Sequence, residues 1–157
     1  MLPHTHFLFG LLIGLLGYWK GQFDLTSVIV LVGVNVLIDI DHPLSYLRHH
    51  GKLKLKSAWN NAVKSHEHER TWVHHPIGIV LVSATLLIIS RFYFLAYAAF
   101  LGYFIHMFID YAHIKKETYN KHEFKKIFNL WLPFSHIEII FDVVLILGNI
   151  FILFLIF

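Results

Sequence analysis

The chain alternates between long apolar stretches and polar segments. A helix needs roughly 20 residues to cross the hydrocarbon core of a bilayer, and the fourth and fifth stretches reach that length unaided. The first three are shorter and have to extend into the polar residues beside them. The pattern predicts a bundle of about five transmembrane helices, over residues 7–19, 25–38, 77–90, 92–111 and 137–157.

The polar connections alternate between short and long. Residues 20–24 and Arg91 form short turns, whereas residues 41–70 and 112–136 form long polar loops. With five crossings, the N-terminus and both long loops lie on one side of the membrane. Of the 13 Lys and Arg residues, only Lys20 and Arg91 fall on the other side. The positive-inside rule therefore predicts that the long loops face the cytoplasm.

The composition agrees with an integral membrane protein. Hydrophobic residues make up 57% of the 157 residues against 15% charged, with a mean hydropathy of +0.61, which is well above a soluble domain. The length predicts a single domain over residues 1–157. The net charge of +3 is modest, and the Lys and Arg residues lie between apolar runs and form no basic stripe with stacking aromatics. Nucleic acid is therefore not an expected partner. Because cysteine is absent, any metal must be held by nitrogen and oxygen ligands.

Histidine is unusually frequent and unusually placed. The predicted topology sends all 13 histidines to the long-loop side. Histidines that serve only packing or solubility would have no cause to avoid one face, although the larger polar mass of this side accounts for part of the bias. The pattern favours a metal site at the cytoplasmic end of the helices.

Two groups of residues have the spacing of a chelating site. His106 and Asp110 are four residues apart inside the fourth stretch, so they project from one helix face. Ionisable groups at membrane depth are costly and mark functional sites by default. Asp39 and His42 share a face at the end of the second stretch, and Asp41 can turn elsewhere or bridge a second ion. Carboxylates oppose the dipole at a helix C-terminus, which a bound cation would compensate.

Two weaker signals lie elsewhere on the same side. His6 precedes the first stretch and His4 lies two residues earlier. One of the two is a plausible ligand, because imidazole is the commonest metal-binding side chain, unless it is an interfacial terminus. Residues 66–76 form the densest histidine cluster, which carries His68, Glu69, Arg70 and His74. It offers ligands, a carboxylate base and a guanidinium that can grip a phosphate. The alternative is a solvated, charged helix end.

Five motifs in order resemble the YdjM-like membrane-bound metal-dependent hydrolases. They are Thr5-His6 with Gly10, Asp39-x-Asp41-His42-Pro43, Arg70 to His74, Gly102-x-x-x-His106-x-x-x-Asp110 and Trp131-Leu132-Pro133-Phe134. The resemblance implies a metal-dependent hydrolase, with ligands at His6, Asp39, Asp41, His74, His106 and Asp110. The family is in turn distantly similar to zinc-dependent phospholipase C, an all-helical enzyme.

The sequence departs from the family pattern at one place. The family usually has histidine before the arginine and glycine after it, where this chain has Glu69 and Thr71. Either Glu69 or the neighbouring His68 takes the role of that histidine.

These observations combine into one hypothesis about function. We expect an all-α integral protein of the inner membrane that hydrolyses a phosphate ester of a membrane lipid with a metal-activated water. The predicted ligands are more than one tetrahedral zinc can use, so we expect two or more ions, with manganese or iron as alternatives to zinc.

The alternative functions are a divalent-metal transporter or sensor and an intramembrane metalloprotease. A further alternative is a structural protein whose metal only stabilises helix packing. The predicted metal ligands are His6, Asp39, Asp41, His42, His68, His74, His106 and Asp110, and the predicted catalytic residues are Asp41, Glu69 and Arg70.

Overall fold

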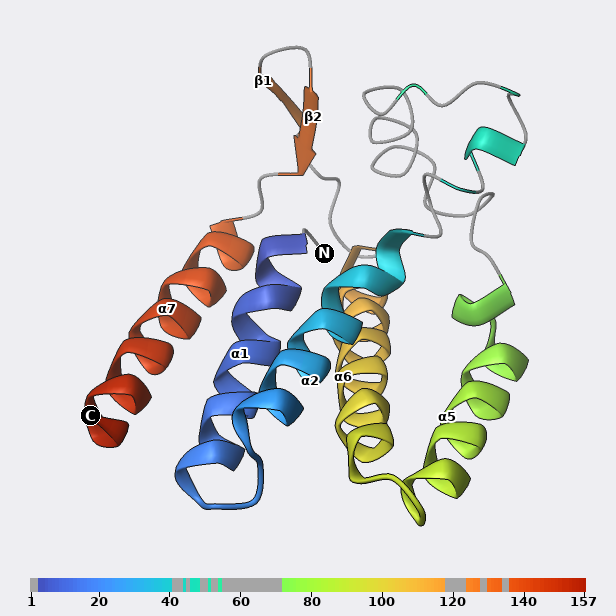
Figure 1. Cartoon of the computed structure of the whole chain (residues 1–157). Helices are drawn as coiled ribbons and strands as arrows, with labels where there is room; N and C mark the ends of the chain where they lie inside the picture. The colour runs from blue at the N-terminus through green and yellow to red at the C-terminus, as the bar shows by residue number, and fades with distance from the viewer. Residues whose placement is uncertain are drawn as a thin grey trace.

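In the computed structural model the long helices reverse direction from one to the next along the chain, and one short hairpin accompanies them (Figure 1). It describes residues 3–40, 44, 46–48, 51, 54, 72–117, 124–127, 130–133 and 136–157, and within 112–138 it describes the backbone alone. In chain order the elements are α1 (Pro3–Trp19), α2 (Leu25–Leu37), the short 3-10 helices η1 (Ile38–Ile40) and η2 (Trp72–His74), α5 (Pro76–Ser90), α6 (Phe94–Glu117), β1 (Phe124–Ile127), β2 (Leu130–Pro133) and α7 (His136–Ile156).

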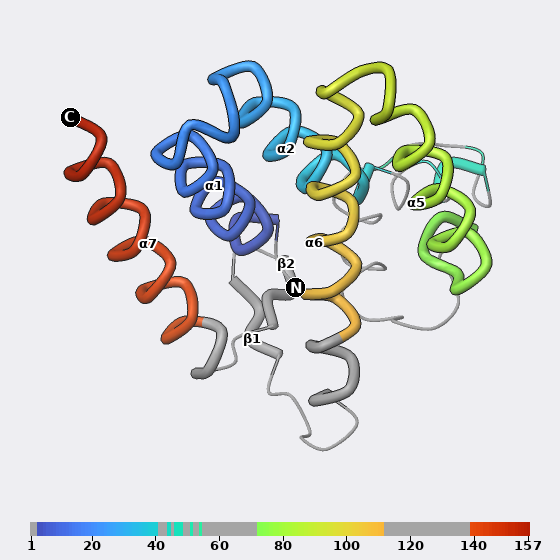
Figure 2. Tube along the Cα trace, turned by 90° about the horizontal axis from the view of Figure 1, so that it is seen from below, coloured from blue at the N-terminus to red at the C-terminus, as the bar shows by residue number. Residues whose placement is uncertain are grey.

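The long helices stand in a row. Helix α2 packs against both α1 and α6, while α7 packs on α1 and α5 packs on α6. Seen from below, the row curves into an arc with α7 and α5 at its two ends (Figure 2). The N-terminus, the end of α2, η2 and the hairpin lie at one end of the helices. The short turns and the C-terminus lie at the other (Figure 1), as the alternation of long and short connections predicted.

Small residues let the three central helices approach closely. A Cβ at Gly10 of α1 would lie 2.5 Å from the side-chain nitrogen of Asn35 on α2. A Cβ at Gly102 of α6 would collide with the backbone carbonyl of Leu31, also on α2. A side chain at Gly102 would meet backbone, and one at Gly10 would displace the Asn35 amide, so α1 and α6 both lie directly against α2. This packing brings the polar ends of the three helices together.

The turn between α1 and α2 is fixed by local chemistry. Gly21 has a φ of 69°, in the left-handed region that glycine adopts without strain. Asp24 caps α2 by accepting hydrogen bonds from the Ser27 hydroxyl at 2.5 Å and from the Ser27 backbone N–H at 2.8 Å. These bonds favour the carboxylate and lower the pKa of Asp24. The turn thus reverses the chain over a few residues.

The outer faces of the row are apolar. Helix α7 is the clearest case, because its segment Ile139–Ile156 has a mean hydropathy of 2.9 and only 17% of it is buried. Such a surface is unstable in water and matches a hydrocarbon environment. In the described part of the chain, two helices, over Phe94–Tyr111 and Ile139–Ile156, are long and apolar enough to cross a membrane, whereas α2 and α5 are shorter apolar helices. The expected total of about five spans stays a prediction.

The segment predicted as the second polar loop contains ordered structure. Helix α6 continues to Glu117, six residues beyond the apolar stretch. An antiparallel hairpin then pairs Phe124 with Pro133 and Ile127 with Leu130. The helical architecture is as predicted, and the hairpin is an addition to it at the same end of the molecule as the N-terminus (Figure 1).

Candidate metal centre

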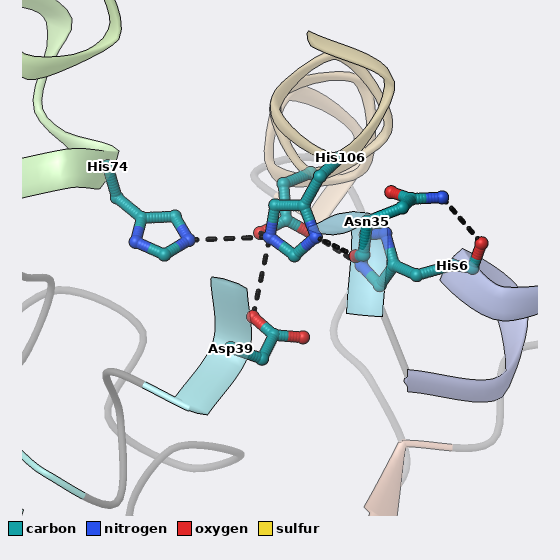
Figure 3. A network of polar contacts seen from close by, with 6 residues as sticks. His6, Asn35, Asp39, His74 and His106 are labelled. Atoms are coloured by element: carbon teal, nitrogen blue, oxygen red, sulfur yellow. Dashed lines mark hydrogen bonds and ion pairs between the residues drawn. The ribbon is translucent and has the colours of Figure 1, made fainter. Parts of the chain in front are cut away.

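His106 lies at the centre of a buried polar cluster (Figure 3). Its side chain is fully buried, and its Nδ1 lies 2.8 Å from the backbone carbonyl oxygen of Asn35. A carbonyl oxygen only accepts, so Nδ1 must carry the proton and donate it. In the neutral ring the lone pair is therefore on Nε2, the tautomer and orientation of a metal-binding imidazole.

Three further donor atoms surround Nε2 of His106. His74 Nε2 lies 3.4 Å away, Asp39 Oδ1 3.4 Å and Asp110 Oδ2 3.7 Å. One donor atom from each of these four residues lies within 4.8 Å of every other. Ligand atoms held tetrahedrally at bond lengths of about 2.0–2.1 Å are about 3.3–3.4 Å apart. The residues present thus fit a metal ion of this size.

The charges and donor types agree with a cation. Two carboxylates approach the same imidazole nitrogen, and like charges at this separation repel each other unless a positive charge lies between them. Two Nε2 atoms that face each other at 3.4 Å need either a proton or a shared cation between them. A divalent ion held by two imidazoles and two carboxylates meets both requirements, and nitrogen and oxygen ligands suit zinc, manganese or iron.

The four ligands come from three separate stretches of backbone. Asp39 lies on η1, which continues α2 one turn beyond Asn35. His74 ends η2, and the hydroxyl of Tyr103 on α6 donates a 2.6 Å hydrogen bond to the carbonyl of Val73 beside it. His106 and Asp110 are one turn apart on α6. The convergence is therefore a property of the tertiary fold and not of a local sequence motif.

His6 on α1 adjoins this cluster. Its ring stacks on that of His106, with centroids 4.2 Å apart and planes 22° from parallel. Its Nε2 lies 3.2 Å from Asp110 Oδ1, which is close enough for an ion pair if His6 is protonated, but the contact lacks hydrogen-bond geometry. Asn35 anchors this part of α1 by donating a 2.6 Å hydrogen bond to the His6 carbonyl.

The structure brings together five of the predicted metal ligands, namely His6, Asp39, His74, His106 and Asp110. The other predicted site residues, Asp41, His42, His68, Glu69 and Arg70, lie outside the described residues. Sequence reasoning missed Asn35 and Tyr103. Neither carries a signal that could have identified it, because Asn35 acts on His106 through its backbone carbonyl and Tyr103 is one of many aromatic residues in the chain.

Polar contacts link α7 to α1 near the site. His4 Nε2 lies 2.8 Å from Asp142 Oδ2 on α7, and Asn149 donates a 2.9 Å hydrogen bond to the carbonyl of Leu8 on α1. Both contacts use polar residues of α7. They fix α7 against α1 without contributing to the cluster.

Comparison with family models matches residues 1–157 to the YdjM inner membrane protein family. The chain belongs to this family. No curated protein and no solved structure matches it. Membership of the YdjM family confirms the resemblance that the ordered motifs indicated and agrees with the apolar outer faces of the helix row. It names neither a metal nor a reaction.

Proposed function

We propose that this YdjM-family protein is a metal-dependent hydrolase that cleaves a phosphate ester of a membrane lipid. The observation that carries the proposal is the convergence of Asp39, His74, His106 and Asp110 from three separate elements at one end of an apolar helix row. Ionisable side chains at such a position are costly and are retained where they have a function.

The access to the cluster favours catalysis over a purely structural metal. A structural site is closed by its protein ligands, whereas a catalytic site keeps a position open to water or substrate. His106 is fully buried, but the side chains of Asp39 and Asp110 remain 20% and 14% exposed. The carboxylate side of the cluster is therefore within reach of a small molecule, while the imidazole side is sealed by packing.

The position of the cluster favours a lipid substrate. It lies at the ends of apolar helices, where the ester bonds of a phospholipid headgroup are also found. Lys20 and Arg91 lie at the turns of the opposite end of the row, and in the sequence the remaining Lys and Arg residues all fall within the polar segments 41–70 and 112–136. By the positive-inside rule this charge distribution supports a site that faces the cytoplasm.

The residues of the site have separable tasks in this proposal. A divalent ion, when bound, supplies Lewis-acid activation of water and of the ester oxygen. The Asn35 carbonyl holds the proton of His106 on Nδ1, so Nε2 stays available as a ligand. Asp39 and Asp110 place negative charge on the exposed side, where either carboxylate can accept a proton from an attacking water.

The predicted catalytic residues extend this scheme. In the hypothesis from the sequence, Arg70 grips the phosphoryl oxygens, and Glu69 or Asp41 acts as a base. The distant similarity to zinc-dependent phospholipase C remains an expectation of the same kind.

Two other functions use the same ligands. A transporter or sensor would pass or report the ion, and an intramembrane metalloprotease would direct the activated water at a peptide bond. The described ligands gather at a single end of the helices, whereas transport is favoured by ligands on both sides of the bilayer. This distribution supports hydrolysis over transport.

The proposal is tested with the full-length protein in lipid vesicles. Vesicles of defined phospholipids, or of total lipid extract, are incubated with zinc-loaded protein, and released headgroups are measured by mass spectrometry. We expect a phosphorylated, water-soluble product from at least one lipid class, and its loss in Asp39→Asn. The variant His75→Gln serves as a control because it alters an exposed imidazole beside the site.

The outcomes separate the competing functions. Unchanged lipids together with zinc accumulation inside the vesicles would favour transport and contradict hydrolysis. Equal product formation by the wild type and by Asp39→Asn would remove the described cluster from the reaction.

A further inference from the structure

Asp110 lies between two imidazoles and offers each a different oxygen. Its Oδ2 lies 3.7 Å from Nε2 of His106, and its Oδ1 lies 3.2 Å from Nε2 of His6. A carboxylate in this position can bridge two cations, with one on each oxygen. The four-residue cluster that fits a single ion uses Asp110 but does not include His6.

His6 is buried without the partners that a buried imidazole needs. It is fully buried, and among the described residues neither of its ring nitrogens has a hydrogen-bond partner. Buried polar atoms are nearly always satisfied, so an orphaned pair calls for a specific explanation. Nε2 of His6 lies 3.2 Å from Oδ1 of Asp110 without hydrogen-bond geometry, and a cation bound by both atoms is compatible with this separation.

The spacing of the two rings matches the spacing of ions in a two-metal centre. The rings of His6 and His106 are nearly parallel, with centroids 4.2 Å apart. In two-metal sites the ions are about 3.5–4 Å apart. Two stacked imidazoles that each present Nε2 to one oxygen of the same carboxylate would hold two ions at a separation of this order.

We propose that His6 and Asp110 form a second divalent-cation site, with Asp110 as the bridge to the ion held by Asp39, His74 and His106. The assignment rests on the metal centre proposed above and gives the stacked imidazoles of His6 and His106 separate ions. It makes His6 specific to the second ion, His74 specific to the first, and Asp110 common to both.

The test counts ions and measures their coupling in the full-length protein. Metal-stripped protein in detergent is loaded with Mn²⁺, the bound metal is quantified by mass spectrometry, and the electron paramagnetic resonance spectrum is recorded. We expect two ions per chain in the wild type, with exchange coupling that removes the hyperfine-split signal of isolated Mn²⁺. His6→Gln should retain one ion and show the isolated signal.

The matched control is His4→Gln, the same substitution two residues earlier on α1. Glutamine at this position can still donate to Asp142, so α1 stays in contact with α7, and the control should keep two coupled ions. A thermal melt checks that each variant is folded. If His6→Gln fails to fold, the wild-type spectrum alone still decides whether the ions are coupled.

The results that would contradict the second site differ from those that would contradict the first. One ion in the wild type, or two uncoupled ions, overturns the second site and leaves the first in place. Two coupled ions in folded His6→Gln overturn the role of His6. No bound ion in the wild type overturns both this inference and the metal centre on which it rests.

Discussion

His106 is oriented by a hydrogen bond from its own ring. The backbone carbonyl of Asn35 accepts the Nδ1 proton, which directs the Nε2 lone pair at His74, Asp39 and Asp110. This partner is a main-chain atom, so no substitution at Asn35 removes the acceptor itself. The orientation of the ligand is therefore set by the position of α2 relative to α6.

Zinc affinity tests the role of His106. His106→Ala removes the nitrogen around which the other donors gather, and we expect zinc affinity to fall by more than about 100-fold, beyond the usual effect of a supporting residue. Competition with a chromophoric chelator measures the change. His75→Ala should leave the affinity unchanged. Equal affinity in both variants would remove His106 from the centre.

Single residues differ in how far their role can be read from the sequence. Asp39, His106 and Asp110 could be predicted, because ionisable groups at membrane depth are rare and helical spacing places them on shared faces. The burial of His6 against His106 could not, because it depends on how closely α1 and α6 approach α2. Main-chain acceptors such as the Asn35 carbonyl are present at every position and carry no sequence signal.

Among the elements, η2 depends most on its neighbours. It is a single short turn, and the Tyr103 hydroxyl holds its Val73 carbonyl from α6. Gly78 lets α5 pack directly under Trp72, since a Cβ there would collide with the Trp72 carbonyl. His74 reaches the cluster because both contacts fix this turn.

Tyr103→Phe removes only the hydroxyl of this contact. We expect about a tenfold loss of zinc affinity, the lower end of the effect of a residue that orients a ligand, and a stability loss of about 1 kcal/mol. Tyr97→Phe is the matched control, six residues earlier on α6 and exposed. Metal titration and thermal unfolding report the two effects. A stability loss with unaltered affinity would make Tyr103 structural alone.

Gly102 tests whether the approach of α2 to α6 sets the site. Gly102→Ala would force its Cβ against the Leu31 carbonyl, so we expect a stability loss of about 1–3 kcal/mol and weaker metal binding. Gly33→Ala is the control, because a Cβ there meets nothing within 4 Å. Thermal unfolding and zinc titration compare the two variants. Equal stability and equal zinc affinity in the two variants would show that the contact between Gly102 and Leu31 does not determine the geometry of the site.

The helices themselves could be predicted more fully than the segments between them. Apolar stretches located all five long helices of the described chain, because length and hydrophobicity determine a helix in lipid. The continuation of α6 to Glu117 and the β1–β2 hairpin fall outside the five apolar stretches. There the alternation of apolar and polar residues is too short to predict the pairing of Phe124 with Pro133.

For the whole molecule, the asymmetry of its two ends is the defining property. The described histidine side chains, namely His4, His6, His74, His75 and His106, all lie at the end that carries the site, while Lys20 and Arg91 lie at the turns of the other end. This arrangement predicts a fixed orientation in the membrane, with the site inside the cell.

The absence of cysteine makes this orientation directly measurable. Gln22→Cys lies in the turn between α1 and α2, and His75→Cys lies at the site end; both positions are exposed. An impermeant thiol reagent should label Gln22→Cys in intact cells, and should label His75→Cys only after the membrane is opened. The cysteine-free parent gives the background. The reverse pattern would contradict a cytoplasmic site.

The central claim is that side chains from α2–η1, η2 and α6 bind one metal ion in common. Anomalous scattering from crystals of the zinc-loaded protein, recorded at the zinc edge, locates the ion directly. The account predicts a peak at bonding distance, about 2.0–2.1 Å, from Nε2 of both His74 and His106, with carboxylate oxygens of Asp39 and Asp110 beside it. A zinc peak that lies away from these four residues, or no peak in fully loaded protein, would contradict it.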